Sequence, residues 1–265
     1  MPPARPDAPD RLLVAGNWKM NGSRALAAAL AQAALDAAHA APEVEVALFP
    51  PAVLLPLVSD AVGAPRGPVA VGGQQCHPEA KGAHTMGIAA AMLAEAGCRY
   101  VLDGHSEVRR EYGYDDARVA AAAEAARAAG LRPIVCVGET RAERDAGQAR
   151  AVLERQVDAV FGSRSAPLAD ADVAYEPVWA IGTGVTPTPE EAERAHGWIR
   201  ARLDAAGAPR SRILYGGSVA PANIGGFLSR PGIDGVLVGG ASLEAASFTA
   251  LVVAARAAAA ARRRP

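Results

Sequence analysis

Three polar side chains in this sequence follow short apolar runs and are of the types that move protons or stabilise charge beside a carbonyl group: Glu176, His105 and Lys19. A carboxylate serves as a general base, a neutral imidazole donates to a carbonyl oxygen, and an ammonium group stabilises developing negative charge. Among 27 basic residues only Lys19 and Lys81 are lysine, the compact point charge that suits a single oxygen. These types together predict proton abstraction next to a carbonyl, with an enediol-type intermediate.

The residues around His105 indicate how its imidazole stays neutral. Gly104 precedes it, and Ser106 and Glu107 follow as the expected start of a helix. Backbone N–H groups at a helix start point toward the preceding side chain and oppose a second proton on the ring. A neutral His105 can then polarise the carbonyl group.

Two glycine-rich turns predict a phosphate site. The first is Gly216-Gly217-Ser218 and the second is Gly239-Gly240, and each closes one of the last two apolar runs. Glycine lets backbone N–H groups approach an anion closely, and the loops after the seventh and eighth strands of a barrel commonly bind phosphate. A small phosphorylated ligand is therefore expected.

The segment after Glu176 has the composition of a lid. Trp179 and Ile181 give it an apolar tip, and Gly182 and Gly184 supply hinges. A solvated surface loop would not normally carry two large apolar side chains. The expected base and the expected lid are thus adjacent in the sequence.

Composition excludes several functions. With 51% hydrophobic and 21% charged residues and a net charge of −1, the 265-residue chain is expected to be globular, with no general field for nucleic acid or an anionic membrane. The cysteines at 76, 98 and 136 are odd in number and far apart, which favours a reducing, cytoplasmic compartment. No HExxH, paired-ligand or GxGxxG pattern is present, so neither a metal nor another cofactor is expected. No secretory signal is visible, and the longest charge-free run, 213–229, is broken by glycines and a proline.

Eight short apolar runs alternate with alanine-rich segments that carry charges at helical spacing. Strict alternation predicts a parallel sheet covered by helices, and eight units favour an α/β fold with a single-domain (β/α)₈ barrel over an open sheet. The polar residues above then meet at the C-terminal ends of the strands, where the loops of a barrel converge. The expected strands are 12–16, 44–49, 69–72, 100–103, 133–137, 173–175, 213–215 and 235–238, and the expected helices are 23–40, 52–62, 87–96, 115–129, 140–161, 188–206, 219–229 and 242–260.

Only the chain ends depart from this pattern. Residues 1–10 are proline-rich and predict a disordered or loosely held extension, whereas residues 261–265 form an arginine-rich tail. Residues 11–260 are expected to form the barrel.

Six motifs resemble triosephosphate isomerase, in order and at the separations expected of that family. The resemblance covers roughly residues 11–255, and the fourth motif is highly specific. The motifs are AGNWKMNG (15–22), GHSE (104–107), CVGET (136–140), AYEPVWAIGTG (174–184), LYGGSV (214–219) and LVGGASL (237–243).

The resemblance implies interconversion of dihydroxyacetone phosphate and D-glyceraldehyde 3-phosphate in glycolysis and gluconeogenesis, without a cofactor and in a homodimer. It implies that Glu176 is the base, His105 the electrophile, and Lys19 and Asn17 substrate contacts. The main chain around Gly182, Ser218, Gly239 and Gly240 would bind the phosphate, with Ser106, Glu107, Cys136, Tyr215, Gly216 and Gly217 in support.

The chain departs from the family pattern outside the expected catalytic residues. Val108 stands where the family usually has an arginine, Met86 and Gly87 replace a glycine and an acid, and Tyr114 replaces another acid. Both members of an intersubunit ion pair are therefore absent, and joint loss of a pair can be close to neutral, so a homodimer is still expected. Pro187 removes an N–H group from the end of the lid.

Three alternative functions use the same residues. A paralogous isomerase could act on a four-carbon ketose phosphate, and a class I aldolase could form a Schiff base at Lys19. A catalytically silent sugar-phosphate-binding barrel would tolerate the loss of Glu176, which is present.

Overall fold

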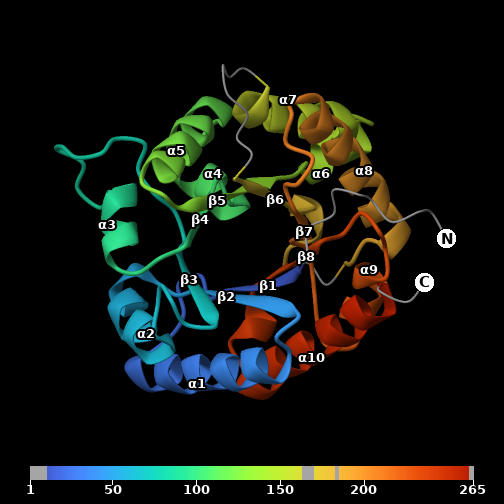
Figure 1. Cartoon of the computed structure of the whole chain (residues 1–265). Coiled ribbons are helices and arrows are strands. Elements are labelled where there is room, and N and C mark those ends of the chain that lie inside the picture. The colour runs from blue at the N-terminus through green and yellow to red at the C-terminus, as the bar shows by residue number, and fades with distance from the viewer. Residues whose placement is uncertain (1–10, 163–169, 183–184, 263–265) are drawn as a thin grey trace.

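Eight parallel strands close into a barrel in the order β1 to β8. The structure is a computed structural model that describes residues 11–162, 170–182 and 185–262. Each strand pairs with its neighbours in sequence, and β1 pairs with β8 to close the ring. Figure 1 shows the helices as a layer around these strands, which confirms the predicted (β/α)₈ barrel. The strands are β1 (Leu12–Asn17), β2 (Val44–Phe49), β3 (Val69–Gly73), β4 (Tyr100–Asp103), β5 (Arg132–Val137), β6 (Asp172–Tyr175), β7 (Ile213–Tyr215) and β8 (Gly235–Val238).

Alternate residues of each strand point to opposite sides of the barrel wall. In β4 the side chains of Tyr100 and Leu102 belong to the packed interior, and that of Val101 packs under the helices. By the same alternation Asp103, the last residue of β4, faces the helix layer. The interior is therefore a filled core, and the strand ends hold the following loops in fixed directions.

Local signals set the starts of the helices. α6 and α8 begin with capping boxes, in which the Thr140 and Thr188 hydroxyls accept from the N–H of the third helical residue, a glutamate whose carboxylate accepts in return. The helices are α1 (Arg24–Ala40), η1 (Ala52–Leu54), α2 (Leu55–Val62), α3 (Ala90–Glu95), α4 (Ser106–Tyr112), α5 (Asp116–Ala128), α6 (Arg141–Asp145), α7 (Ala149–Phe161), η2 (Val178–Ala180), α8 (Pro189–Ala205), α9 (Ile224–Leu228), η3 (Gly240–Ser242) and α10 (Ala245–Arg262).

Three expected helices differ from the observed ones. The helix expected over 140–161 is broken into α6 and α7, because Gly147 takes a left-handed φ of +71° just after α6. The helix expected over 87–96 starts at Ala90, because residue 89 is extended and forms a bridge with residue 77. The helix expected over 219–229 shortens to α9, which begins only after Pro221, a poor helix former.

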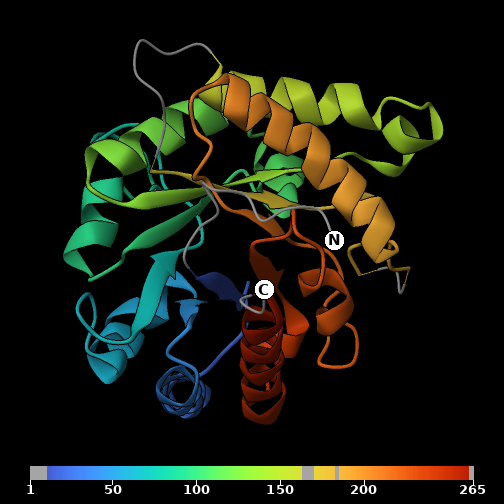
Figure 2. The same cartoon turned by 45° about the vertical axis from the view of Figure 1, so that its right-hand side comes forward.

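Helix α10 is the one helix among the described residues whose length and composition would allow it to cross a membrane. Its buried side chains include Phe248, Leu251, Val252 and Ala255. Figure 2 shows α10 beside α1, which it contacts in the helix layer. We interpret α10 as a barrel helix whose apolar face covers β1 and β2.

The end of α10 lies past residue 260, where the barrel was expected to end. The Arg262 guanidinium donates to the carbonyl oxygens of Leu228, Arg230 and Ile233 and so ties the helix to the segment after α9. Residues 1–10, expected to be a disordered or loosely held extension, and residues 263–265 of the expected arginine-rich tail lie outside the described residues.

A buried charged network closes the N-terminal end of the barrel. The Arg212 guanidinium donates to Asp172 at 3.0 Å, to Glu45 at 2.7 Å and to the Tyr100 hydroxyl at 2.7 Å, and Arg132 donates to both Asp172 oxygens. Burial raises the pKa of Asp172, but the two arginines outweigh burial and lower it. The network joins side chains from β2, β4, β5 and β6 at the end opposite the predicted site.

Candidate active site

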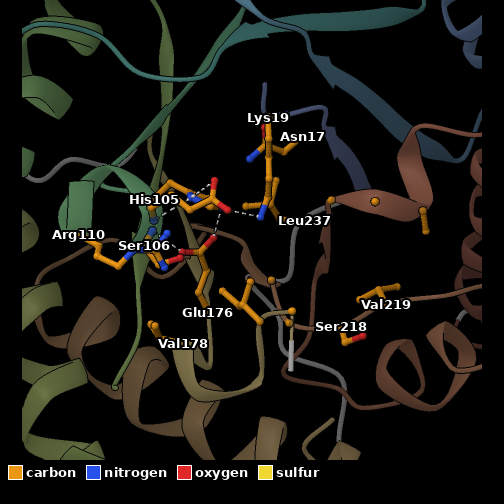
Figure 3. Close-up of a pocket in the computed structure, with 18 residues that line it drawn as sticks. Asn17, Lys19, His105, Ser106, Arg110, Glu176, Val178, Ser218, Val219 and Leu237 are labelled. Carbon is orange, nitrogen blue, oxygen red and sulfur yellow. Dashed lines mark hydrogen bonds and ion pairs between the residues drawn. The ribbon is translucent and has the colours of Figure 1, made fainter. Parts of the chain in front are cut away.

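A cavity of about 440 Å³ opens at the C-terminal ends of the strands (Figure 3). Its walls come from the loops after β1, β4, β6, β7 and β8. Every residue predicted as catalytic or phosphate-binding lines it, together with four of the supporting residues. These lining residues are Asn17, Lys19, His105, Glu176, Gly182, Ser218, Gly239 and Gly240, with Ser106, Glu107, Gly216 and Gly217.

Glu176 follows β6 and is only 2% exposed. Its Oε1 lies 3.0 Å from His105 Nε2, and its Oε2 accepts from the Ser106 N–H at 2.9 Å. Burial raises its pKa, but the charge and hydrogen bond of His105 and the Ser106 N–H outweigh burial, so the pKa of Glu176 lies below its usual value. The carboxylate is thus ionised and accessible from the cavity.

His105 is the N-cap residue of α4, and its ring lies between the helix start and Glu176. The Glu107 N–H donates to Nδ1 at 3.2 Å, so the single ring proton belongs on Nε2, where it faces Glu176. Burial lowers the pKa of His105, and the Glu176 carboxylate reverses this and raises it. The Glu107 N–H that donates to Nδ1 nevertheless favours the tautomer without a proton on Nδ1, because a protonated Nδ1 would face another proton.

Lys19 has a left-handed φ of 52°, which is unusual for a residue other than glycine. Asn17 Oδ1 accepts from its N–H at 3.0 Å, and Gln74 donates to its carbonyl oxygen at 2.8 Å. These bonds hold the strained backbone and direct Nζ to Glu107 Oε1 at 2.7 Å, at the edge of the cavity. The structure therefore places a fixed ammonium group beside Glu107 and close to His105.

The glycine-rich turns approach the cavity with backbone instead of side chains. A Cβ atom at Gly217 would lie 2.2 Å from the Tyr215 hydroxyl, and one at Gly216 would lie 3.0 Å from Glu176 Cγ. Gly239 precedes the short helix η3, and a Cβ atom at this position would lie 3.4 Å from Lys19 Cε. This arrangement leaves N–H groups and a helix start near a cation, as an anion site requires.

The segment after Glu176 is held by a buried carboxylate that sequence reasoning did not assign. Glu139, just after β5, accepts from the Trp179 indole N–H at 2.7 Å and from the Tyr175 hydroxyl at 3.1 Å. The Arg144 guanidinium lies over the Trp179 ring at 4.1 Å. Residues 183–184 of the predicted lid lie outside the described residues, and Gly182 lines the cavity.

Two supporting residues lie behind the cavity wall. Cys136 belongs to the barrel interior, and the Tyr215 ring stacks on Phe227 at a centroid distance of 4.0 Å. Arg110 also lines the cavity, and the sequence analysis did not predict this polar residue as part of the site. Its position four residues after Ser106, on the same face of α4, was a signal that could have identified it.

No three His, Cys, Asp or Glu side chains in the described parts of the chain cluster closely enough to hold a metal ion.

The chain was compared with families, curated proteins and solved structures. The family model described as triosephosphate isomerase matches residues 12–255. A triosephosphate isomerase of Afipia carboxidovorans is 50% identical over 250 residues, which cover 92% of this chain and 97% of the relative. One of Dinoroseobacter shibae is also 50% identical over 250 residues, with 92% and 98% covered. The crystal structure of triosephosphate isomerase from Bartonella henselae matches with a TM-score of 0.83 and 36% identity, and covers 92% of this chain and 98% of that one. The chain therefore belongs to the triosephosphate isomerase family.

Proposed function

We propose that this protein interconverts dihydroxyacetone phosphate and D-glyceraldehyde 3-phosphate through an enediol intermediate, as a glycolytic and gluconeogenic isomerase that needs no cofactor. The observation that carries the proposal is the direct contact of a buried carboxyl group with an imidazole, Glu176 Oε1 to His105 Nε2 at 3.0 Å, in a cavity lined by glycines. A base and a hydrogen-bond donor at that spacing suit the two ends of a carbon–carbonyl unit.

The phosphate group of the substrate fixes its position. The main chain of Gly182, Ser218, Gly239 and Gly240 offers N–H groups on one side of the cavity, and Lys19 adds a positive charge. A triose phosphate held there extends its carbonyl group toward His105 and its adjacent carbon toward Glu176. Positioning of this kind converts proton abstraction into an effectively intramolecular step.

The base gains strength when substrate enters. In the structure Glu176 accepts from His105 and from the Ser106 N–H, and both contacts lower its pKa. A substrate placed between Glu176 and His105 breaks the contact with the imidazole, so the buried carboxylate becomes a stronger base. Glu176 then takes the proton from one carbon and returns it to the neighbouring carbon.

His105 stabilises the charge that develops on the substrate oxygen. Its Nε2–H is free to donate to that oxygen once Glu176 has moved off, while the Glu107 N–H keeps Nδ1 unprotonated. Lys19 Nζ, bonded to Glu107 at 2.7 Å, supplies a positive charge that stabilises the negative charge on the substrate. An ammonium group paired in this way is a poor Schiff-base nucleophile, which argues against the aldolase alternative.

A coupled isomerase assay tests the proposal. The purified chain is given dihydroxyacetone phosphate or a four-carbon ketose phosphate, and aldose formation is followed with the matching dehydrogenase. Turnover of the three-carbon substrate with a higher kcat/KM is expected. Absence of turnover, or a preference for the four-carbon substrate, would overturn it.

We also propose that the protein is a cytoplasmic homodimer. Met20, Val53 and Met86, on the loops after β1, β2 and β3, are 95%, 88% and 82% exposed, an apolar set that a second copy can cover. Gly87 and Val108 leave no unpaired charge at this surface. The three cysteines are all free and buried, which suits a reducing compartment.

Sedimentation across a micromolar dilution series tests the dimer. A dimeric species that dissociates only on dilution is expected. A single monomeric species at every concentration, with unchanged activity per subunit, would refute it.

A further inference from the structure

A glutamine outside the cavity lining holds the backbone just before His105. Gln75, in the loop after β3, accepts from the Gly104 N–H through Oε1 at 3.1 Å. Its Nε2 donates to Asp103 Oδ1 at 2.9 Å and to the Cys76 carbonyl oxygen at 2.9 Å. The side chain therefore joins the end of β3 to the end of β4, where the loop that carries His105 begins.

Asp103 is an unusual residue for its position. It is fully buried at the end of β4, and its Oδ2 has no hydrogen-bond partner among the residues that the structure describes. Burial raises its pKa to about 7, although bonds from Cys76 and Gln75 act in the opposite direction. A buried carboxyl group with one oxygen unpaired destabilises a fold compared with an apolar side chain, so its presence here points to a role other than stability.

The hydrogen bonds of Gly104 fix the backbone that carries His105. Gly104 has a φ of +73°, its N–H is bonded to Gln75, and its carbonyl oxygen accepts from Arg109 Nε at 2.9 Å. Both peptide groups that flank Gly104 are thus fixed, and His105 follows directly. A rotation of the Gly104 peptide would turn the imidazole away from Glu176.

The Gly104 N–H has an acceptor only if the Gln75 side-chain amide is oriented with Oε1 toward it. An amide can be reversed by rotation about its last bond, which exchanges its donor and its acceptor. The Oδ1 atom of Asp103 and the Cys76 carbonyl are both acceptors, so Nε2 must face them and Oε1 must face Gly104. Asp103 therefore fixes the orientation in which Gln75 can accept from Gly104.

We propose that Asp103 and Gln75 are a positioning pair that holds the Gly104 peptide and, through it, the His105 imidazole in the reactive direction. The inference rests on the proposed isomerase function and adds two residues that touch neither substrate nor cavity. Its consequence is that reversing the donor and the acceptor between Asp103 and Gln75 restores the bond within the pair, and with it part of the support.

The test is a donor–acceptor swap within the pair. Gln75→Met removes all three hydrogen bonds of the Gln75 side chain. The kcat is expected to fall about tenfold or more, with KM within about twofold, because a small misplacement of a reacting group is costly. Gln75→Glu keeps an acceptor for Gly104 but places two carboxyl groups at 2.9 Å, and kcat should also fall. Asp103→Asn in the same chain restores a donor opposite Glu but not the bond to the Cys76 carbonyl oxygen, so the double variant should have a higher kcat than Gln75→Glu without reaching the parent.

A control on the same strand separates positioning from stability. Tyr100→Phe removes the bond from the Tyr100 hydroxyl to Glu45 at the other end of β4, and should lower the melting temperature while leaving kcat unchanged. If Gln75→Met does not fold, the comparison of Gln75→Glu with the double variant decides the question alone.

The outcomes separate this inference from the proposed function. An inactive parent chain contradicts the isomerase function itself. An active parent with unchanged kcat in folded Gln75→Met, or a double variant no better than Gln75→Glu, overturns the positioning pair and leaves the function standing.

Discussion

Two buried tyrosines that are partners in the β6–β7 ladder should respond in opposite ways to loss of their hydroxyl groups. Tyr175 donates to the Glu139 carboxylate at 3.1 Å. The Tyr215 hydroxyl is buried and has no hydrogen-bond partner in the described part of the chain, while its ring stacks on Phe227. Tyr175→Phe therefore removes a bond, whereas Tyr215→Phe removes an unpaired polar group.

The expected magnitudes follow from these contacts. A hydrogen bond to a charged group contributes roughly 1.5–3 kcal/mol, so Tyr175→Phe should lower the free energy of unfolding by about 2 kcal/mol. A buried unpaired hydroxyl costs about 1–3 kcal/mol, so Tyr215→Phe should raise the free energy of unfolding by about 1 kcal/mol. For a chain of this size, each kcal/mol shifts the melting temperature by about 2–4 °C.

The Tyr215 hydroxyl should also contribute little to closure of the predicted lid. Pro187 is buried before α8 and has no N–H with which a closed lid could donate to the Tyr215 hydroxyl. Pro189 occupies the first turn of α8, where the missing N–H costs nothing. The kcat of Tyr215→Phe should therefore stay within tenfold of the parent.

Urea unfolding and steady-state kinetics on the parent and both variants test this reasoning. A Tyr215→Phe protein that is less stable than the parent by more than about 1 kcal/mol would show that the hydroxyl has a partner. A loss of kcat beyond about tenfold would place that partner in the closed lid.

Three further substitutions probe the site and the fold. Glu176→Asp should leave the fold intact and lower kcat about 10²-fold or more, because the carboxylate retreats by about 1 Å from a near-attack position; unchanged turnover would exclude Glu176 as the base. His105→Gln should lower kcat by about 10²–10⁴-fold, and an effect on KM alone would contradict its role. Burial, with the nearby Arg200, lowers the pKa of His196 to about 4. Its imidazole takes up a proton in the unfolded chain below about pH 6.5 but not in the folded protein, so stability falls by about 3 kcal/mol from this group as pH drops from 6.5 to 4. Urea unfolding should show a weaker pH dependence in His196→Gln, and identical slopes would refute this.

The sequence could predict what periodicity and residue type determine. Alternation of apolar strands with alanine-rich helices is a local pattern, and it located all eight strands to within a residue or so. The predicted cavity-lining residues were predictable for a related reason, because each lies at the end of a strand or in the segment that follows one, and a barrel brings all such positions to one end. Breaks within helices depend on single residues, and Gly147 was overlooked for that reason.

Contacts between loops were not predictable in the same way. Glu139 lies 40 positions before Trp179, and Gln75 lies 28 positions before Asp103. No spacing rule relates such pairs, since their distance depends on how two loops leave adjacent strands. Sequence reasoning also expected a neutral imidazole but not its direct contact with Glu176, 71 positions away, which depends on the packing of α4 against β6.

The N-terminal end of the barrel holds contacts that stabilise the fold, whereas the C-terminal end holds the candidate active site. At the N-terminal end Arg212, Asp172 and Glu45 satisfy one another with short, buried bonds. At the C-terminal end lie Lys19, with its left-handed backbone, and Asp103, with one oxygen that has no partner among the described residues. Such features destabilise a fold and persist where function requires them. Apolar replacement of Asp103 should therefore raise stability and lower activity together, whereas Tyr100→Phe should lower stability alone, and the opposite pairing would contradict this division.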